Sequence, residues 1–440
     1  MKKKIRIGCG AGFSGDRLEP AALLVEQGNI DYLVLECLAE RTIALAQKRK
    51  NEDPSKGYDV LLEKRMQVLL PLIKKKGVRL ISNMGAANPM GAAQKIIELA
   101  KANSIQIKVA VLTGDDVLDQ ITGNEIALES NQALKVSGEL VSANAYLGAD
   151  TFIEALNTDA DIIITGRVAD PSLFVAPIMH ELGWDLNDMD HTAQATVIGH
   201  LMECAGQITG GYYADSFKKT VNGLEDLGFP IAEVHDNGLT TISKIESTGG
   251  AITVATTKEQ LLYEVTNPFA YLTPDVVADF SEVSIQSHKK NEVTVSGGKG
   301  STRPTNLKVS VGYRAGYRGE GEISYAGHKA LERAQLAKKI IEKRLKKDFP
   351  DLRIDLIGYN SLHGSVSNKA SQAYEVRLRA AALASTSESA ARIGEEVEAL
   401  YTNGPAGGGG ARKSVGEVLG IVSTLIDRNR VQGAIKFLES

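Results

Sequence analysis

The chain has 440 residues, a formal net charge of −4 at pH 7 and 24% charged residues. It is therefore long enough for about two or three domains, and it lacks the basic excess that nucleic-acid binding requires. No apolar run is long enough to span a membrane, and the basic start at residues 1–4 precedes too short an apolar stretch for a signal peptide. Three scattered cysteines, Cys9, Cys37 and Cys204, predict reduced thiols in a cytoplasmic chain.

Residues 1–207 alternate between short apolar runs and helical patterns. Strands are expected over 4–9, 31–36, 78–82, 106–112 and 161–165. Helices are expected over 16–27, 38–50, 58–75, 146–156 and 189–207, and from residues 89 and 171 onward. Strands that alternate with helices pair in parallel, and strands this apolar are covered on both faces. The pattern predicts an α/β domain with a doubly wound, mainly parallel sheet.

The rest of the chain has a different texture. Residues 208–304 hold many glycines and short β-rich runs, and we expect a β-rich connecting region there. From 305 to 440 the pattern predicts a C-terminal α+β sandwich of ββαββα type, in which strands over 307–313 and 318–325 form a hairpin. The glycine run at 404–410 has two interpretations, a flexible linker or an anion-binding nest of backbone amides, and a helical tail is expected after it.

The candidate site lies in the five loops that follow the expected strands of the first domain. Ligands of open parallel sheets bind beyond the carboxyl ends of the strands, so these loops are expected at one edge. Their candidate substrate-binding residues are Gly10, Gly12, Ser14, Asn83, Gly85, Asn88, Gly114 and Gly166. Their candidate catalytic residues are Asp16, Arg17, Glu36, Arg167 and Asp170.

Each candidate also has a structural interpretation. A glycine-flanked arginine such as Arg167 suits a two-pronged contact with a substrate carboxylate or phosphate, but an ion pair with Asp170 or Asp16 is the alternative. Asp16, Glu36 and Asp170 are candidates for general acid or base, although an aspartate near a helix start is often only a cap.

Further patterns in the sequence suggest ligands. Asp115 and Asp116 offer hard oxygen ligands for a divalent metal such as magnesium. The amides of the loop glycines Gly10, Gly12, Gly85 and Gly114 are expected to stabilise an oxyanion. His200 and Cys204 share a helix face, which indicates either a zinc site or a buried pair. Residues 207–215 could close over the sheet edge as a lid, and the glycines of 8–15 form a weak dinucleotide fingerprint.

Five motifs carry a family resemblance. They are residues 10–17 (GAGFSGDR), 164–170 (ITGRVAD), 199–204 (GHLMEC) with 209–211 (TGG), 229–233 (FPIAE) and 403–409 (NGPAGGG). Over essentially its whole length the chain resembles the acyclic terpene utilisation AtuA family. Long members carry an extra small C-terminal domain, which we expect this chain to lack. The resemblance then implies a separate small AtuA-like protein as a partner, and substrates that are branched or hydroxylated carboxylic acids or their CoA thioesters.

Together these observations predict a catabolic enzyme of the lyase or hydratase type, acting on a small acid or its CoA thioester. In this hypothesis Arg167 clamps the substrate carboxylate, and Asp16, Asp170 or Glu36 transfers protons. The cofactor is open, with a divalent metal as one option, and a homo-oligomer is expected. The alternative is a non-catalytic subunit that binds a ligand or a small AtuA-like protein. A nucleotide-dependent dehydrogenase is the weaker alternative.

Overall fold

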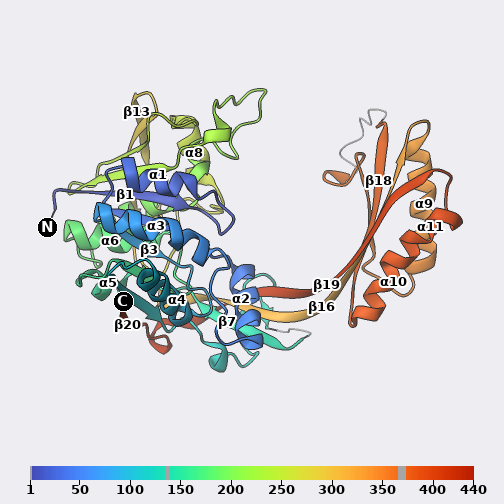
Figure 1. The fold of residues 1–440 in the computed structure, drawn as a ribbon, viewed down its shortest axis with the longest axis horizontal. Helices are drawn as coiled ribbons and strands as arrows, with labels where there is room; N and C mark the ends of the chain where they lie inside the picture. The colour runs from blue at the N-terminus through green and yellow to red at the C-terminus, as the bar shows by residue number, and fades with distance from the viewer. Residues whose placement is uncertain (1, 135–137, 365–372) are drawn as a thin grey trace. The chain divides into compact units, whose positions relative to one another are not determined.

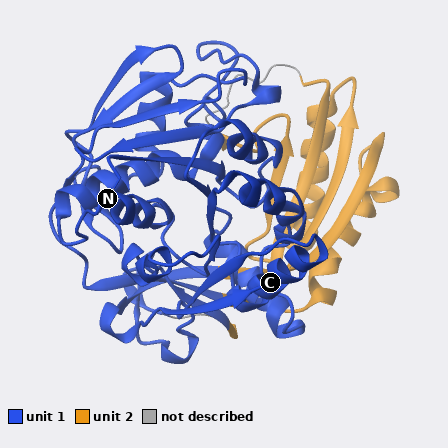
Figure 2. Cartoon of the chain, turned by 60° about the vertical axis from the view of Figure 1, so that its left-hand side comes forward, with its two compact units in different colours: residues 1–135, 141–312, 421–440 blue, residues 136–140, 313–420 orange. Residues whose placement is uncertain are grey.

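The computed structural model describes residues 2–134, 138–364 and 373–440. The chain forms two compact units (Figure 2). The first unit comprises residues 1–135, 141–312 and 421–440, and the second comprises residues 136–140 and 313–420. The chain therefore leaves the first unit and returns to it. Within the described ranges, no helix has both the length and the apolar character needed to cross a membrane.

A ten-stranded sheet forms the centre of the first unit (Figure 1). Its middle strands are, in spatial order, β1 (Lys4–Ala11), β2 (Tyr32–Leu35), β3 (Arg79–Ser82), β8 (Ile162–Ile164) and β4 (Lys108–Thr113). All four pairings among them are parallel. The five strands expected from the apolar runs are thus present and parallel. Their side chains are almost all buried, as in a sheet that is covered on both faces.

Antiparallel strands extend this sheet at both edges. They are β9 (Pro230–His235), β10 (Thr240–Lys244), β14 (Glu292–Ser296) and β13 (Ser284–Lys289) beyond β1, and β20 (Ala434–Glu439) beyond β4. In β10 buried and partly exposed residues alternate, which is typical of an antiparallel strand with one covered face. The sheet is therefore mixed, and residues 208–304 contribute four of its strands. The doubly wound arrangement remains a prediction.

Helices pack around the sheet and against one another. Those of the first unit are α1 (Glu19–Gln27), α2 (Glu40–Glu52), α3 (Leu62–Lys76), α4 (Pro89–Ala102), α5 (Ile153–Leu156), α6 (Ser172–Leu182), α7 (Met189–Glu203) and α8 (Val254–Leu262). The helix expected over 146–156 was wrong in its first half, where β7 (Leu140–Ala145) is followed by a loop and a short 3-10 turn. The remaining short strands are β5 (Ile126–Ala127), β6 (Gln132–Ala133), β11 (Tyr271–Leu272), β12 (Val277–Asp279) and β15 (Lys299–Gly300).

The second unit has its own sheet and its own apolar core. Its elements are α9 (Ala330–Leu345), β17 (Arg353–Ile357), β18 (Glu375–Ala384), α10 (Ser387–Glu398), α11 (Leu400–Asn403) and most of the two long strands β16 (Asn306–Ala326) and β19 (Gly408–Asp427). Residues 306–312 of β16 and 421–427 of β19 belong to the first unit. β18 pairs antiparallel with β16 and β17, and α9 and α10 contact β18 (Figure 1). The finer prediction of an α+β sandwich stays a prediction.

Two expectations for this region were wrong. Residues 307–325 form no hairpin, because β16 is one continuous strand of 21 residues whose second half pairs with β18. The tail after the glycine run is not helical but forms β19 and β20. Val415, Val418, Ile421 and Val422 explain this, since β-branched residues favour strands. The glycine run itself ends in the first residues of β19, so it is not a free linker.

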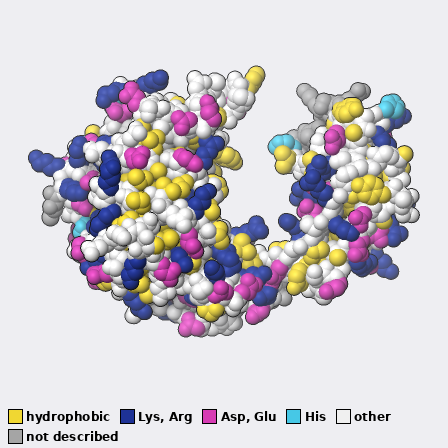
Figure 3. Space-filling view, in the orientation of Figure 1, with side chains coloured by type: hydrophobic (Ala, Val, Ile, Leu, Met, Phe, Trp, Pro, Cys, Tyr) yellow, Lys and Arg dark blue, Asp and Glu magenta, His cyan; other side chains and the backbone are white. Residues whose placement is uncertain are grey.

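The surface carries charges of both signs. Figure 3 shows Lys and Arg side chains interspersed with Asp and Glu side chains over the visible face of the first unit. Such mixing agrees with the small net charge of the chain.

Candidate functional site

A cavity of about 810 Å³ lies at the carboxyl edge of the parallel strands in the first unit. The loops after β1, β2 and β8 and the end of α7 line it. Its lining includes the predicted residues Gly12, Ser14, Asp16, Arg17, Glu36 and Asp170. It also includes Cys204 and Tyr212, which the sequence suggested for a zinc site and a lid, and residues that the prediction did not include, among them Glu40, Glu203 and Glu264. The sheet edge thus brings six predicted residues to one cavity, as the rule for ligand sites in parallel sheets leads one to expect.

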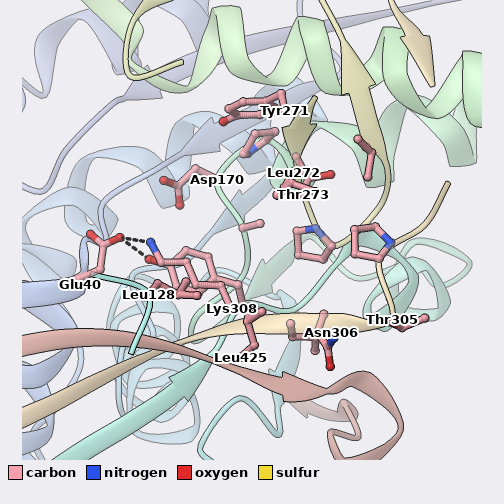
Figure 4. Close-up of a pocket in the computed structure, with 17 residues that line it drawn as sticks. Glu40, Leu128, Asp170, Tyr271, Leu272, Thr273, Thr305, Asn306, Lys308 and Leu425 are labelled. Carbon is pink, nitrogen blue, oxygen red and sulfur yellow. Dashed lines mark hydrogen bonds and ion pairs between the residues drawn. The ribbon is translucent and has the colours of Figure 1, made fainter. Parts of the chain in front are cut away.

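A second cavity, of about 520 Å³, has a mainly apolar lining. Glu40 and Asp170 line both cavities, so the two meet at these residues. In Figure 4 Glu40, Leu128 and Asp170 lie on one side of this second cavity and Thr305 on the other. A ligand with a polar part and a hydrocarbon part would find both environments within one unit.

Arg167 lies behind the cavities instead of facing them. Its side chain is 1% exposed, and its guanidinium donates to the carbonyl oxygens of Leu38 and Val168 and to Oδ1 of Asp170. The guanidinium also stacks on the ring of Tyr146, with its carbon 4.4 Å from the ring centre. The structure therefore contains the ion pair with Asp170 that was the alternative interpretation. A direct clamp on a substrate carboxylate does not fit this placement, because the donors of Arg167 face protein acceptors.

Glu36 is fixed at the end of β2 by its neighbours. Its Oε1 accepts hydrogen bonds from the backbone amide of Leu38 at 2.9 Å and from Nδ2 of Asn83 at 2.8 Å. The Oδ1 atom of Asn83 in turn accepts from the amide of Cys37 at 2.7 Å. Asn83 thus does not line the cavity itself but holds a carboxyl group that does.

Three carboxyl groups, the buried Glu36 and Glu203 and the partly exposed Asp170, sense the charge of the buried Arg167, and Asp170 is the one that pairs with it. Burial raises the pKa of Glu36, and the charge of Asp170 raises it further, while Arg167 opposes the shift. Burial also raises the pKa of Asp170 and of Glu203, and again Arg167 acts in the opposite direction. Three carboxylates around one cation would leave an excess negative charge in a poorly solvated place. We therefore expect the group to hold at least one proton at neutral pH.

Glu203 is a site residue that the prediction did not include. It is the last residue of α7 and lies on the same helix face as His200, one turn earlier. Its Oε1 lies 2.9 Å from Nδ1 of His200, whose Nε2 donates to the carbonyl oxygen of Leu261 at 3.2 Å. Both ring nitrogens are thus engaged with the protein, which fits the buried-histidine alternative better than a zinc site. The spacing His-x-x-Glu was the signal in the sequence that could have revealed the pair.

The loop after β1 is organised by its own aspartate. Oδ2 of Asp16 accepts from the amide of Gly12 at 2.7 Å, and burial raises the pKa of Asp16. The amide of Gly12 is therefore already engaged, and an oxyanion or a dinucleotide phosphate would have to displace Asp16 to use it. Arg17 donates to the carbonyl oxygens of Leu224 and Glu225. The buried Arg65, also absent from the prediction, holds the loop from behind by donating to the carbonyls of Ser14 and Asp16.

The loops after β3 and β4 do not line the larger cavity. Asn88 caps α4 by accepting from the amide of Gly91 at 3.1 Å. Added Cβ atoms would lie 2.4 Å from a backbone oxygen at Gly85 and 2.1 Å from one at Gly114, so both glycines are packed against the chain. Gly10 is likewise enclosed, by side chains of β2 and α1, and Gly166 by the carboxyl group of Asp115.

Asp115 and Asp116 serve the protein in different ways. Oδ2 of Asp115 accepts from the amide of Arg167 at 3.0 Å and from Nδ2 of Asn144 at 2.9 Å, and burial raises the pKa of Asp115 to about 6. Oδ1 of Asp116 accepts from the amide of Leu118. Neither residue lines the larger cavity, and the described residues contain no group of three His, Cys, Asp or Glu side chains placed to hold a metal. The pair as placed does not fit a magnesium site.

Comparison with known proteins agrees with the motifs. No match is found among curated proteins or among solved structures. The family model described as "Acyclic terpene utilisation family protein AtuA" matches residues 5–437, which is nearly the whole chain. The resemblance carried by the five motifs is thereby confirmed, and the chain belongs to the acyclic terpene utilisation AtuA family, which is broadly catabolic.

Proposed function

We propose that this protein is an enzyme of the lyase or hydratase type that acts on a small branched or hydroxylated carboxylic acid or on its CoA thioester. The observation that carries the proposal is the pair of carboxyl groups at the larger cavity, the buried Glu36 and the partly exposed Asp170, beside the buried Arg167. Removing or adding water next to a carbonyl requires one group that takes a proton and one that gives a proton. Carboxyl groups whose environments separate their pKa values can divide these two tasks.

Within the proposal, Glu36 and Asp170 form the acid–base pair. Asn83 and the amide of Leu38 hold Glu36 in one orientation, as a proton-transfer group requires. Asp170 lines both cavities and is paired with Arg167 from behind. Arg167 then acts through Asp170, whose ionised form it favours, instead of touching the substrate.

The second cavity suits the hydrocarbon part of such a substrate. Leu128, Leu272, Val277, Leu307 and Leu425 contribute to its lining, which is mainly apolar. A branched alkyl group placed there would leave water at a favourable free energy of about 0.8 kcal/mol for each buried methylene. The membership in a family implicated in terpene utilisation supports a branched hydrocarbon substituent.

The first test is a thermal-shift screen, followed by turnover assays on the hits. Short branched and hydroxylated acids, their unsaturated counterparts and the CoA esters of both are compared, since a ligand that binds the native state raises the melting temperature. Glu36→Gln and Asp170→Asn should lower turnover by roughly 10²- to 10⁴-fold and still bind the hit. Asp159→Asn, an exposed residue paired with Lys108, is the matched control and should behave as wild type. Full turnover in both site variants would refute the acid–base assignment.

Exposed aromatic side chains favour a second candidate, a subunit that works in a complex. Phe13 and Tyr212 line the larger cavity yet are 60% and 83% exposed, and Phe217 nearby in sequence is 85% exposed. Exposed aromatic side chains are enriched at surfaces that bind other proteins. If the purified chain is inert towards every member of the panel and gains activity when a small AtuA-like protein is added, the second candidate is favoured over the first.

A further inference from the structure

Glu203 lines the larger cavity, and one of its two carboxyl oxygens has no partner among the described residues. Its side chain lines that cavity, and the whole residue is only 8% exposed. Its Oε1 contacts His200, but its Oε2 is buried and has no hydrogen-bond partner among the residues that the structure describes. A buried carboxyl oxygen without a partner is unfavourable, which makes it a candidate for contact with a ligand.

The hydrogen-bond network decides where the proton of this pair lies. The carbonyl oxygen of Leu261 can only accept, so Nε2 of His200 must carry a hydrogen. In a neutral imidazole the other nitrogen, Nδ1, is then an acceptor. Glu203 can form its contact with Nδ1 only by donating, which means that its Oε1 carries a proton. The alternative, an imidazolium next to a carboxylate, would place two charges in this buried position.

The surroundings favour the neutral form of both residues. Burial lowers the pKa of His200 to about 4. Burial raises the pKa of Glu203, the charges of Asp170 and Glu264 raise it further, and Arg167 opposes them. Glu203 also lies at the C-terminal end of α7, where the helix dipole disfavours a negative charge. The other titratable groups that sense its charge are Tyr271 and Cys204.

We infer that Glu203 and His200 form a proton-holding couple in which Glu203 is an additional catalytic acid or base of the larger cavity and His200 is its positioning residue. When Oε2 of Glu203 takes a proton from a bound molecule, the proton on Oε1 passes to Nδ1 of His200. The bound molecule loses one proton, Glu203 remains neutral with its proton now on Oε2, and His200 becomes an imidazolium. The reverse movement returns the proton on Oε2 to the bound molecule, and Oε1 of Glu203 recovers its proton from Nδ1 of His200. This use of the couple rests on the proposed function.

The core environment explains why His200 suits this task. Its ring contacts those of Tyr271 and Phe280, with centroid separations of 5.1 and 5.5 Å. These aromatic neighbours fix the plane of the imidazole, so that its Nδ1 stays directed at Glu203. A transient imidazolium would keep its bond to the Leu261 carbonyl and gain favourable contact with the two aromatic rings.

The existence of the couple is tested by infrared difference spectroscopy on the full chain at pH 7, without any ligand. Glu203→Gln should remove a band from the carbonyl stretch of a protonated carboxyl group. The matched control is Glu233→Gln, because Glu233 pairs with Arg6 and its low pKa keeps it ionised, so that this variant should remove carboxylate bands. If Glu203→Gln removes carboxylate bands instead of the band of a protonated carboxyl group, the couple as assigned is wrong.

The state of His200 gives an independent check. In the chain labelled with nitrogen-15 in its imidazole rings, the signals lost in His200→Gln should be those of a neutral Nε2–H ring at pH 7. The same variant should shift the frequency of the Glu203 band, because the hydrogen bond to Nδ1 is removed, whereas a merely structural histidine would leave that band in place. An imidazolium signal for His200 at pH 7 would overturn the assignment.

The catalytic use is tested with a probe that allows only proton transfer. The thioester 3-methylbutanoyl-CoA has exchangeable α-hydrogens and no group to eliminate. We expect the protein to exchange these hydrogens for deuterium in heavy water, and Glu203→Gln to slow the exchange by about a hundredfold or more. Equal exchange in wild type and variant would overturn the catalytic role of Glu203. Absence of exchange in both would count against the proposed thioester chemistry, whereas the infrared result decides separately whether the couple exists.

Discussion

The five loops that follow the parallel strands fall into two groups, those that line the larger cavity and those that do not. The loops after β1, β2 and β8 line the larger cavity, whereas those after β3 and β4 do not. In the second group the side chains cap a helix, accept backbone amides or pack against neighbouring chain, as Asn88 and Asp115 show. The topology of a parallel sheet therefore brings residues to one edge, but local packing decides which of them remain open to a ligand.

Arg167 connects the two groups, and its removal should have the largest effect. Its backbone amide donates to Asp115 and its guanidinium to Asp170. Arg167→Met would leave buried carboxyl groups and carbonyl oxygens without their cation, and we expect a loss of roughly 3–5 kcal/mol in the free energy of unfolding. Denaturant unfolding monitored by circular dichroism measures this. Arg17→Met, which removes only exposed bonds to two carbonyls, should change stability by about 0.5 kcal/mol or less.

A small loss in Arg167→Met, similar to that in Arg17→Met, would mean that the carboxyl groups at the cavity do not depend on the cation behind them. Arg167 would then not couple the two groups of loops, and each group would have to be treated as independent of the other.

Asp115 belongs to the buried, structural group, and the pH dependence of stability should reveal it. Its pKa rises from an ordinary value of 3.8 to about 6 in the folded chain. The folded state therefore binds the proton more tightly than the unfolded state, so that stability from this residue falls as the pH rises from about 4 to 6. The loss is on the order of 3 kcal/mol. Asp115→Asn should remove this slope from a series of unfolding curves.

A second buried aspartate provides a control for that experiment. Asp275 accepts from the amide of Ala149 and from Ser172, and burial raises its pKa to about 6 as well. Asp275→Asn should flatten the same pH range, and the two effects should add because the residues share no hydrogen-bond partner. An Asp115→Asn variant with the full wild-type slope would show that Asp115 stays ionised in the folded chain.

Gly12 lies in a loop that lines the larger cavity, and it allows the backbone of this loop to lie close to the end of α7. A Cβ atom at this position would lie 2.5 and 2.6 Å from backbone atoms of Cys204, which directly follows Glu203. Gly12→Ala should therefore cost about 1–3 kcal/mol and displace the end of α7. Thermal unfolding measures the cost, and Gly409→Ala, where nothing lies within 4 Å of the added atom, is the control that should leave stability unchanged or slightly higher. Equal melting temperatures for the two variants would contradict the close approach.

The sequence allowed much of the first unit to be predicted, for a physical reason. Short apolar runs such as 161–165 favour buried strands, and parallel pairing then places Glu36 and Asp170 at one edge. Glu203 escaped prediction because it ends a helix, and no rule based on strand ends includes it. Whether Gly85 and Gly114 face a cavity or pack against the chain depends on contacts with residues distant in sequence, which local patterns do not contain.

In the second unit and the tail that follows it, the sequence predicted the strands less well. A glycine-containing stretch inside 307–325 favours a hairpin when it is considered alone, but β16 continues through it because it pairs with β18, β19 and β7. The tail is similar, because β20 becomes a strand by pairing with β4, which lies more than 300 residues earlier in the chain. Local propensity is a weak guide where long-range pairing decides the structure.

Glu40 stands at the boundary of the two cavities, and its substitution should have the smallest effect on stability. Its Oε1 accepts from the hydroxyl of Tyr146 at 2.6 Å and from Nζ of Lys308 at 3.0 Å, and its side chain is 39% exposed (Figure 4). Burial alone would raise its pKa, but these two contacts bring the pKa down to about 2. Its stabilising contribution is therefore present above about pH 4.5 and lost as the pH falls towards 2.

Glu40→Gln keeps an acceptor for both contacts and removes only the charge, so we expect a loss of about 0.2–1 kcal/mol at pH 7 and a smaller difference near pH 2. Binding should respond in the opposite direction. Lys308 lines the apolar cavity, and without the charge of Glu40 it becomes a cation available to a ligand carboxylate. Titration calorimetry with the acids found in the thermal-shift screen should then show tighter binding to Glu40→Gln than to wild type. Weaker binding would instead mean that Glu40 itself contacts the ligand, and that the boundary between the cavities belongs to the polar site.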